Sequence, residues 1–152
     1  MGEVITLLFR SRRFIIGAAL FTLVLAFGVI GPRVTSKDPF LMAGGLFDPP
    51  SEGSMLGTDN LGRDVFTQLM YGTGTSLLIG FVAGIVATVI GVAIGTLAGF
   101  KGGVIDELLM GVTNILITIP SIVVLILLSV AVKGRSATTM GVIIGVPAWP
   151  WT

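Results

Sequence analysis

The sequence predicts an all-α integral membrane protein, and three observations lead to that prediction. Hydrophobic residues make up 53% of the chain, and its mean hydropathy is +1.02. Charged residues make up only 11%, whereas a soluble domain carries about 25%. The charges are also segregated, because none lies within residues 65–100 or 108–132. These uncharged runs exceed the ~20 residues that a helix needs to cross a bilayer.

The residue types that are missing exclude several kinds of chemistry. The sequence has no cysteine and no histidine, which excludes thiol catalysis, disulfides and histidine-based acid–base catalysis or zinc binding. No nucleophile–base pair, metal-ligand cluster or phosphate-binding loop is present. The net charge is +1, and no basic patch lies outside the N-terminus. We therefore expect no enzyme, no metal, no cofactor in this chain and no nucleic-acid partner.

The first predicted span covers residues 14–30 and is closed by Gly31 and Pro32. A cleaved signal peptide is the alternative, but such apolar regions usually run about 7–15 residues, and more apolar runs follow here. An uncleaved anchor is therefore favoured. A cluster of basic residues precedes the span and predicts a cytoplasmic N-terminus, residues 1–13. Basic residues elsewhere do not support this orientation, so it rests on the cluster alone: Arg10, Arg12 and Arg13.

Residues 31–75 are predicted to form an external segment that is rich in proline, glycine and acidic residues. At its end, residues 60–73 predict an amphipathic helix lying at the membrane interface, capped by Thr58, Asp59 or Asn60. Asp59 and Arg63 have the i,i+4 spacing of a helical ion pair. A cap and a surface ion pair would explain these charges without a functional role. A calcium loop is not predicted, because the acids lack the required alternation.

The second predicted span, residues 76–100, carries a small residue at every fourth position from Ala83 to Gly99. Such a ridge lets two helix backbones approach closely in lipid, so we expect this helix to pack tightly against another. The alternative is a lipid-facing helix with incidental small residues. The ridge consists of Ala83, Ala87, Gly91, Gly95 and Gly99.

A cytoplasmic turn at residues 101–107 leads into the third predicted span, residues 108–132. Pro120 lies at its middle and predicts a kink, placed near a gate, because proline removes a backbone donor. Asn114, Thr118 and Ser121 follow at i, i+4 and i+7 and form a polar stripe. The stripe either lines a solute path or supplies hydrogen bonds that compensate for the kink and hold neighbouring helices.

The fourth predicted span begins after an external turn at residues 133–136 and runs over residues 137–152. No polar or basic tail follows it. We therefore interpret this span as truncated and the sequence as part of a longer chain.

Residues 56–66, LGTDNLGRDVF, resemble the LGTDxxGRDV signature of permeases in the dipeptide/oligopeptide/nickel branch of ABC importers. The resemblance runs from about Asp48 to the end of the third span and is closest to the second of the two permease subunits. Further matching segments are residues 71–72, 76–80, 91–99, 102–103, 106–110 and 119–121. The signature residues are Gly57, Thr58, Asp59, Gly62, Arg63 and Asp64.

This resemblance implies a type I ABC-importer transmembrane domain in the cell membrane, of six spans, with the N-terminus cytoplasmic. The sequence would hold the first three spans and most of the fourth. Implied partners are a homologous second permease subunit, two cytoplasmic ATPases that bind ATP-Mg, and an extracellular solute-binding protein. The cytoplasmic loop that couples such permeases to the ATPases would follow Thr152. The sequence departs from the family's basic residues at Gln68, Gly74 and Gly111, and from its aspartate at Asn114.

The function predicted is that of a permease subunit forming half of the path for peptides or related solutes. The alternative is a subunit of an ion-coupled secondary transporter, which normally carries an ionisable residue within the membrane. Residues 76–100 and 108–132 contain none. The solute itself, whether dipeptide, oligopeptide, oligosaccharide or nickel, is not specified by the sequence.

Overall fold

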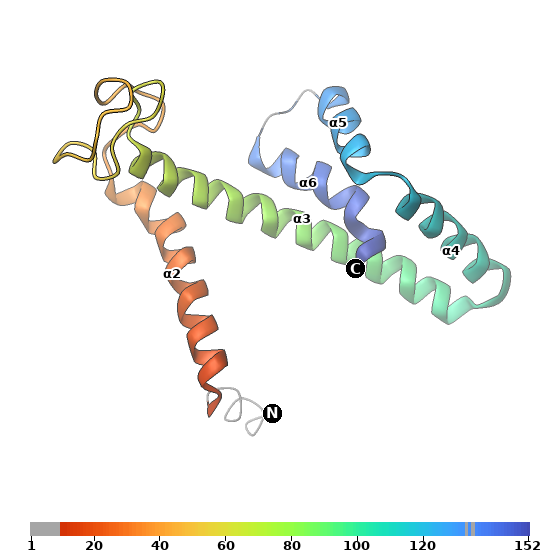
Figure 1. Cartoon of the computed structure of the whole chain (residues 1–152). Coiled ribbons are helices and arrows are strands. Elements are labelled where there is room, and N and C mark those ends of the chain that lie inside the picture. The colour runs from red at the N-terminus through yellow and green to blue at the C-terminus, as the bar shows by residue number, and fades with distance from the viewer. Residues whose placement is uncertain (1–9, 133, 135) are drawn as a thin grey trace. The chain divides into compact units, whose positions relative to one another are not determined.

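The computed structural model describes residues 10–132, 134 and 136–152, and within these the fold is all-helical, as predicted (Figure 1). Residues 1–9, Lys133 and Arg135 lie outside the described residues, so most of the predicted cytoplasmic N-terminus and half of the turn at 133–136 do too. The helices are α2 (Arg12–Val34), α3 (Val65–Lys101), α4 (Gly103–Thr118), α5 (Ser121–Ala131), α6 (Ala137–Ala148) and the short 3-10 helix η1 (Trp149–Trp151).

Two helices, α2 and α3, are each long and apolar enough to cross a membrane. A third crossing exists if α4 and α5, which meet at a bend of 89°, form one broken span. Helix α2 passes through Pro32 and ends at Val34, beyond the end at residue 30 that the sequence predicted. Pro32 cannot donate to the carbonyl of Gly28, and this freed carbonyl lies against α3.

The prediction of a separate interfacial helix at residues 60–73 is wrong. Residues 60–64 are not helical, and residues 65–73 are the first turns of α3, which continues without interruption to Lys101. The helix has 37 residues and is therefore about 55 Å long. It is continuous because no proline interrupts it. The contacts within the chain divide it into two compact units, residues 1–77 and 78–152.

In the first unit, the second half of α2 packs against the first turns of α3. A Cβ atom on Gly74 would stand 2.5 Å from the carbonyl oxygen of Gly28, and one on Gly31 would stand 2.8 Å from the sulfur of Met70. The rings of Phe27 and Phe66 meet edge to face with centroids 5.8 Å apart. Glycine is thus required at this contact because the two backbones touch.

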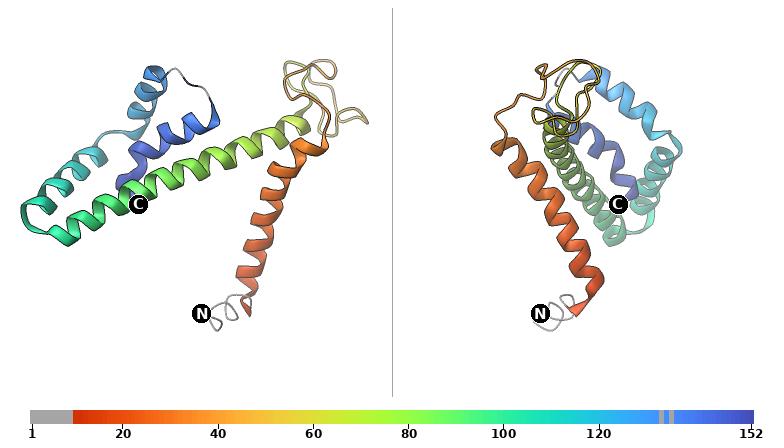
Figure 2. Two further views of the ribbon diagram at one scale, coloured as in Figure 1. Left: turned by 180° about the vertical axis from the view of Figure 1, so that it is seen from behind. Right: turned by 60° about the vertical axis from the view of Figure 1, so that its left-hand side comes forward.

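In the second unit, α6 lies beside α3 and runs parallel to it (Figures 1 and 2). A Cβ atom on Gly141 would stand 2.6 Å from Cβ of Val82. One turn further along, a Cβ on Gly145 would stand 2.7 Å from the carbonyl oxygen of Ala83. Thr152 then donates to the carbonyl of Ala87 at 3.3 Å. The contacts advance in the same direction along both helices, which defines the parallel arrangement.

This parallel arrangement determines how α4 and α5 cross. The first turns of α6 lie near Ile79 and Val82, roughly 30 Å along α3 from Lys101 at its end. Helices α4 and α5 must carry the chain back over that distance. A re-entrant loop would return the chain to the end of α3 where it began and would make α6 antiparallel. This geometry favours one broken crossing over a re-entrant loop for the bent pair α4–α5.

At Pro120 the structure has a complete break where the sequence predicted a kink. Helix α4 ends at Thr118, and Ile119 and Pro120 have ψ angles of 126° and 115°. Helix α5 then starts at Ser121 in a new direction. Proline disfavours the helical conformation for the residue before it, so Ile119 becomes extended and the helix ends.

Candidate functional site

The six signature residues form the closed base of the loop that joins α2 to α3. Thr58 pairs with Asp64 in an isolated β-bridge, and its backbone N–H donates to the carbonyl of Asp48 at 3.0 Å. Its hydroxyl donates to the carbonyl of Gly45 at 2.6 Å and accepts from the N–H of Asp48 at 2.8 Å. Thr58 is buried, and its hydroxyl joins two segments of the loop by hydrogen bonds.

Asp59 organises the tight turn that follows. One carboxylate oxygen accepts from the backbone N–H groups of Leu61 and Arg63 at 2.8 and 2.9 Å. The other accepts from the guanidinium of Arg63 at 2.7 and 2.8 Å and from the amide of Gln68 at 3.0 Å. The bond from the Arg63 side chain is the main cause that lowers the pKa of Asp59 far below its usual range. The predicted pair therefore forms, but across a turn rather than along a helix.

Asp64 is the residue that caps α3, in place of the predicted Thr58, Asp59 or Asn60. Its Oδ1 accepts from the N–H of Phe66 at 3.1 Å. Its Oδ2 accepts from the hydroxyl of Thr67 at 3.0 Å and from the ammonium of Lys37 at 2.9 Å. Burial raises the pKa of Asp64, but hydrogen bonds from Lys37 and Thr67 outweigh it, and the net shift is downward. Lys37 thereby ties the end of α2 to the start of α3.

The two signature glycines have backbone conformations that other residues adopt at a cost. Gly57 and Gly62 have φ angles of 75° and 73°, in the left-handed region. A Cβ on Gly57 would stand 2.4 Å from the carbonyl oxygen of Asp48, and one on Gly62 would stand 2.6 Å from that of Gly44. The signature is therefore a set of residues that folds one compact loop between α2 and α3.

Replacing Asp64 by alanine is expected to loosen this loop base by about 2 kcal/mol, the sum of a lost helix cap and a lost charge-assisted hydrogen bond. Amide hydrogen exchange of Phe66 and Thr67 should become faster. Because the folded protein holds the pKa of Asp64 low, the carboxylate stabilises the loop at neutral pH. This contribution decreases as the pH falls below the ordinary aspartate pKa and is lost once it passes the lowered value.

Asp38→Ala is the matched control for that change, because the Asp38 carboxylate accepts from the nearby N–H of Phe40 at 2.8 Å and not from a distant side chain. Exchange at Phe66 should be unchanged in this variant. Equal acceleration in both variants would show that the Lys37–Asp64 pair does not hold the loop.

The predicted polar stripe is divided by the break between α4 and α5. Asn114 and Thr118 share one face of α4, whereas Ser121 begins α5 in a different direction. All three are exposed. The hydroxyl of Thr118 donates to the carbonyl of Ile115 at 2.7 Å. Their role in a solute path remains a prediction.

The predicted small ridge of α3 is only partly in contact within the described residues. Ala83 meets Gly145, and Ala87 and Gly91 meet Thr152. In contrast, a Cβ on Gly95 or Gly99 would meet no atom within 4 Å. The closest approaches to the backbone of α3 come from glycines that the sequence analysis did not single out, although their spacing of four was a signal: Gly141 and Gly145 of α6.

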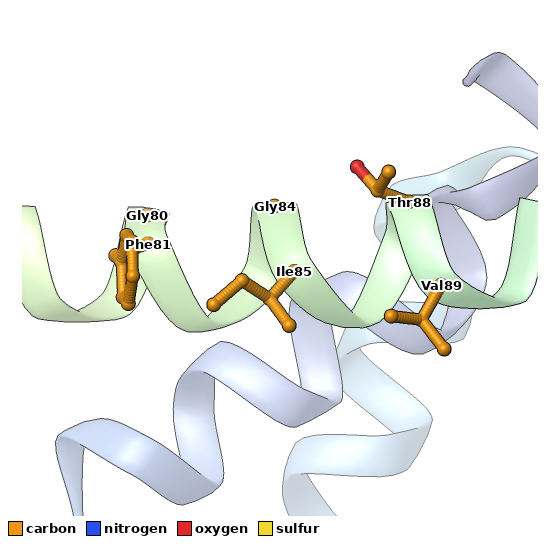
Figure 3. Close-up of a pocket in the computed structure, with 6 residues that line it drawn as sticks. All are labelled: Gly80, Phe81, Gly84, Ile85, Thr88 and Val89. Carbon is orange, nitrogen blue, oxygen red and sulfur yellow. The ribbon is translucent and has the colours of Figure 1, made fainter.

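A shallow apolar groove of about 450 Å³ lies on another face of α3 (Figure 3). Gly80 and Gly84 form its floor, since a Cβ on either would meet no atom within 4 Å. Its remaining lining is Phe81, Ile85, Thr88 and Val89. It contains no titratable group, so it offers shape but no acid–base chemistry. Among the described residues, no cluster of three or more acidic side chains could hold a metal ion.

The chain is similar to curated permease proteins, although no family model matches it. It is 39% identical over 137 residues to the dipeptide transport system permease protein DppC of Bacillus subtilis, covering 87% of this chain and 42% of the relative. It is 32% identical over 126 residues to the oligopeptide permease protein OppC of the same organism, covering 80% and 41%. It is 30% identical over 131 residues to the probable D,D-dipeptide permease protein DdpC of Escherichia coli, covering 86% and 44%. The chain thus spans less than half the length of these relatives.

Proposed function

From the homology of this chain to dipeptide and oligopeptide ABC transport permeases, we propose that it is a permease subunit of an ATP-driven importer of peptides or related solutes. The observation that carries the proposal is 39% identity over 137 residues to a dipeptide permease. The structure adds that the signature residues close one loop between two helices long enough to span a membrane. Nothing supports the ion-coupled alternative.

The chain is a multi-pass membrane protein, and we propose the following partners for it. Large apolar side chains are exposed along α2 to α5, where lipid or other helices would cover them. The expected partners are the lipid bilayer, a second homologous permease subunit, an extracellular solute-binding protein and two cytoplasmic ATPases. ATP-Mg would be bound and hydrolysed by those ATPases, and this chain would act as a transport subunit and not as an enzyme.

The proposal is tested by uptake of a radiolabelled dipeptide and tripeptide into cells that lack the gene for this protein. Uptake should fall at least tenfold in these cells and should return when the gene is supplied. Unchanged uptake of every peptide, together with a loss of uptake driven by an ion gradient, would favour the alternative transporter.

Single cysteines test the orientation, because the chain contains none of its own. A cysteine at Ser51 or Ser136 should react with an impermeant thiol reagent added outside the cell, and one at Lys101 should not. Labelling at Ser51 and protection at Lys101 follow from a cytoplasmic N-terminus. Labelling at Ser136 follows from the crossing of α4 and α5. The reverse pattern would invert the topology, and protection of both Ser136 and Lys101 would make α4–α5 a re-entrant loop.

Thr118→Val is expected to lower transport several-fold without removing the protein from the membrane, because the change removes a hydroxyl and keeps the shape of the side chain. Uptake and the amount of protein in the membrane are measured together. Thr113→Val is the matched control, since the Thr113 hydroxyl also donates to a carbonyl of its own helix, at 2.7 Å, but on another face. Equal transport in the two variants would remove Thr118 from the solute path.

A further inference from the structure

The break between α4 and α5 leaves backbone groups without partners. Pro120 has no N–H to give to the carbonyl of Leu116. Within the part of the chain that the structure describes, no backbone bond joins Ser121 to Ile117 or Ile122 to Thr118, and the N–H of Val123 turns back to the carbonyl of Pro120 at 2.9 Å. Both donors and acceptors of the main chain are therefore free at this point.

These free groups lie well inside the crossing. Helix α4 contributes 16 residues before the break and α5 contributes 11 after it, so the break is about three or more helical turns from either end. Hydrocarbon offers no hydrogen bonds, and irregular backbone at this depth occurs only where protein buries it or where it borders water.

The described chain does not bury the break. Thr118, Ile119, Pro120 and Ser121 are all exposed. One turn earlier on the face of Thr118, the exposed amide of Asn114 makes no hydrogen bond to another described residue. Polar side chains and free backbone groups thus collect at one place on a crossing that is otherwise apolar.

We propose that this segment, residues 114–122, lines a water-filled part of the translocation path and offers neutral hydrogen bonds to the amide groups of the solute. A neighbouring transmembrane helix could satisfy these groups only through its polar side chains, because its own backbone groups are bonded within it. Water and a polyamide chain both carry donors and acceptors that can match groups pointing in different directions around an 89° bend.

The chemistry of this lining fits solutes with amides and sets no preference for charge. No ionisable side chain lies within residues 108–132, so hydrogen bonding rather than ion pairing would act on the solute. This inference rests on the proposed function only for the identity of the solute. The contact with water is argued from the free backbone groups and the exposed polar side chains, and does not depend on which solute is transported.

The test uses single-cysteine variants Ile119→Cys and Ser121→Cys in membranes that contain the complete transport system, without nucleotide and with ATP. A charged methanethiosulfonate reagent should modify both at least tenfold faster than Leu127→Cys in one of these states. Leu127 is an exposed apolar residue of the same helix α5, and a lipid-soluble maleimide should reach it. Excess transported dipeptide should slow modification of Ser121→Cys at least threefold.

Charged-reagent rates as slow as that of Leu127→Cys in both states would overturn the inference and would show that lipid or a partner subunit covers the break. Fast modification without protection by dipeptide would overturn the solute contact. Uptake of labelled dipeptide by the parent chain is measured in the same cells. Absent uptake there would contradict the proposed function, whereas intact uptake with slow modification would contradict this inference alone.

Discussion

Replacing Gly145 by leucine is expected to separate α6 from α3 and to reduce the amount of assembled protein in the membrane at least several-fold. A Cβ at this position would stand 2.7 Å from the carbonyl oxygen of Ala83 and 2.8 Å from Cβ of Val86. These atoms belong to the helix backbone or its first branch and cannot turn away. Extra methylenes in a packed core cost about 1–3 kcal/mol, and leucine adds more than one.

The matched control is Gly111→Leu in α4, where a Cβ would meet no atom within 4 Å. Membrane fractions of the two variants are compared by immunoblot. The control should retain the parent level unless a partner subunit occupies that face of α4. Equal amounts of Gly145→Leu and parent protein would show that the α3–α6 contact does not hold this unit together.

Gly57→Ala is expected to have the largest effect of any single-methyl change in the loop between α2 and α3. Its left-handed conformation, φ 75°, costs an alanine roughly 1–2 kcal/mol. The new methyl would also stand 2.4 Å from the carbonyl oxygen of Asp48. That oxygen accepts the N–H of Thr58 at 3.0 Å, and the carbonyl of Gly57 accepts the N–H of Val65 at 3.1 Å. Relieving the clash would therefore detach the loop from the start of α3.

Limited proteolysis measures this effect as faster cleavage within residues 38–62. The matched control is Gly53→Ala in the same loop, where the nearest atom to the new methyl is the Ser51 hydroxyl at 3.9 Å. Cleavage of that variant should match the parent chain. If both variants resist the protease equally, the signature glycines are not required for the fold of the loop.

The membrane class and the order of apolar segments could be read from the sequence because they depend on local composition. Uncharged runs predicted helices in residues 76–100 and 108–132, and Pro120 predicted a disruption of the second. Such signals act within a few residues, since a missing N–H or an absent charge has its effect where it stands. The spacing of Asp59 and Arg63 likewise predicted their ion pair, which forms at 2.7 Å.

Several features depended on residues far apart in the chain. Asp64 caps α3 with help from Lys37, 27 positions earlier, which no local capping pattern could show. The small ridge of α3 is packed where Gly145 meets Ala83 and open where Gly95 has no neighbour. The parallel arrangement of α6 and α3, which favours one broken crossing for α4 and α5, is visible only from the atoms of the two helices that touch. Periodicity identifies a face that can pack, but the element that covers it is determined by long-range contacts.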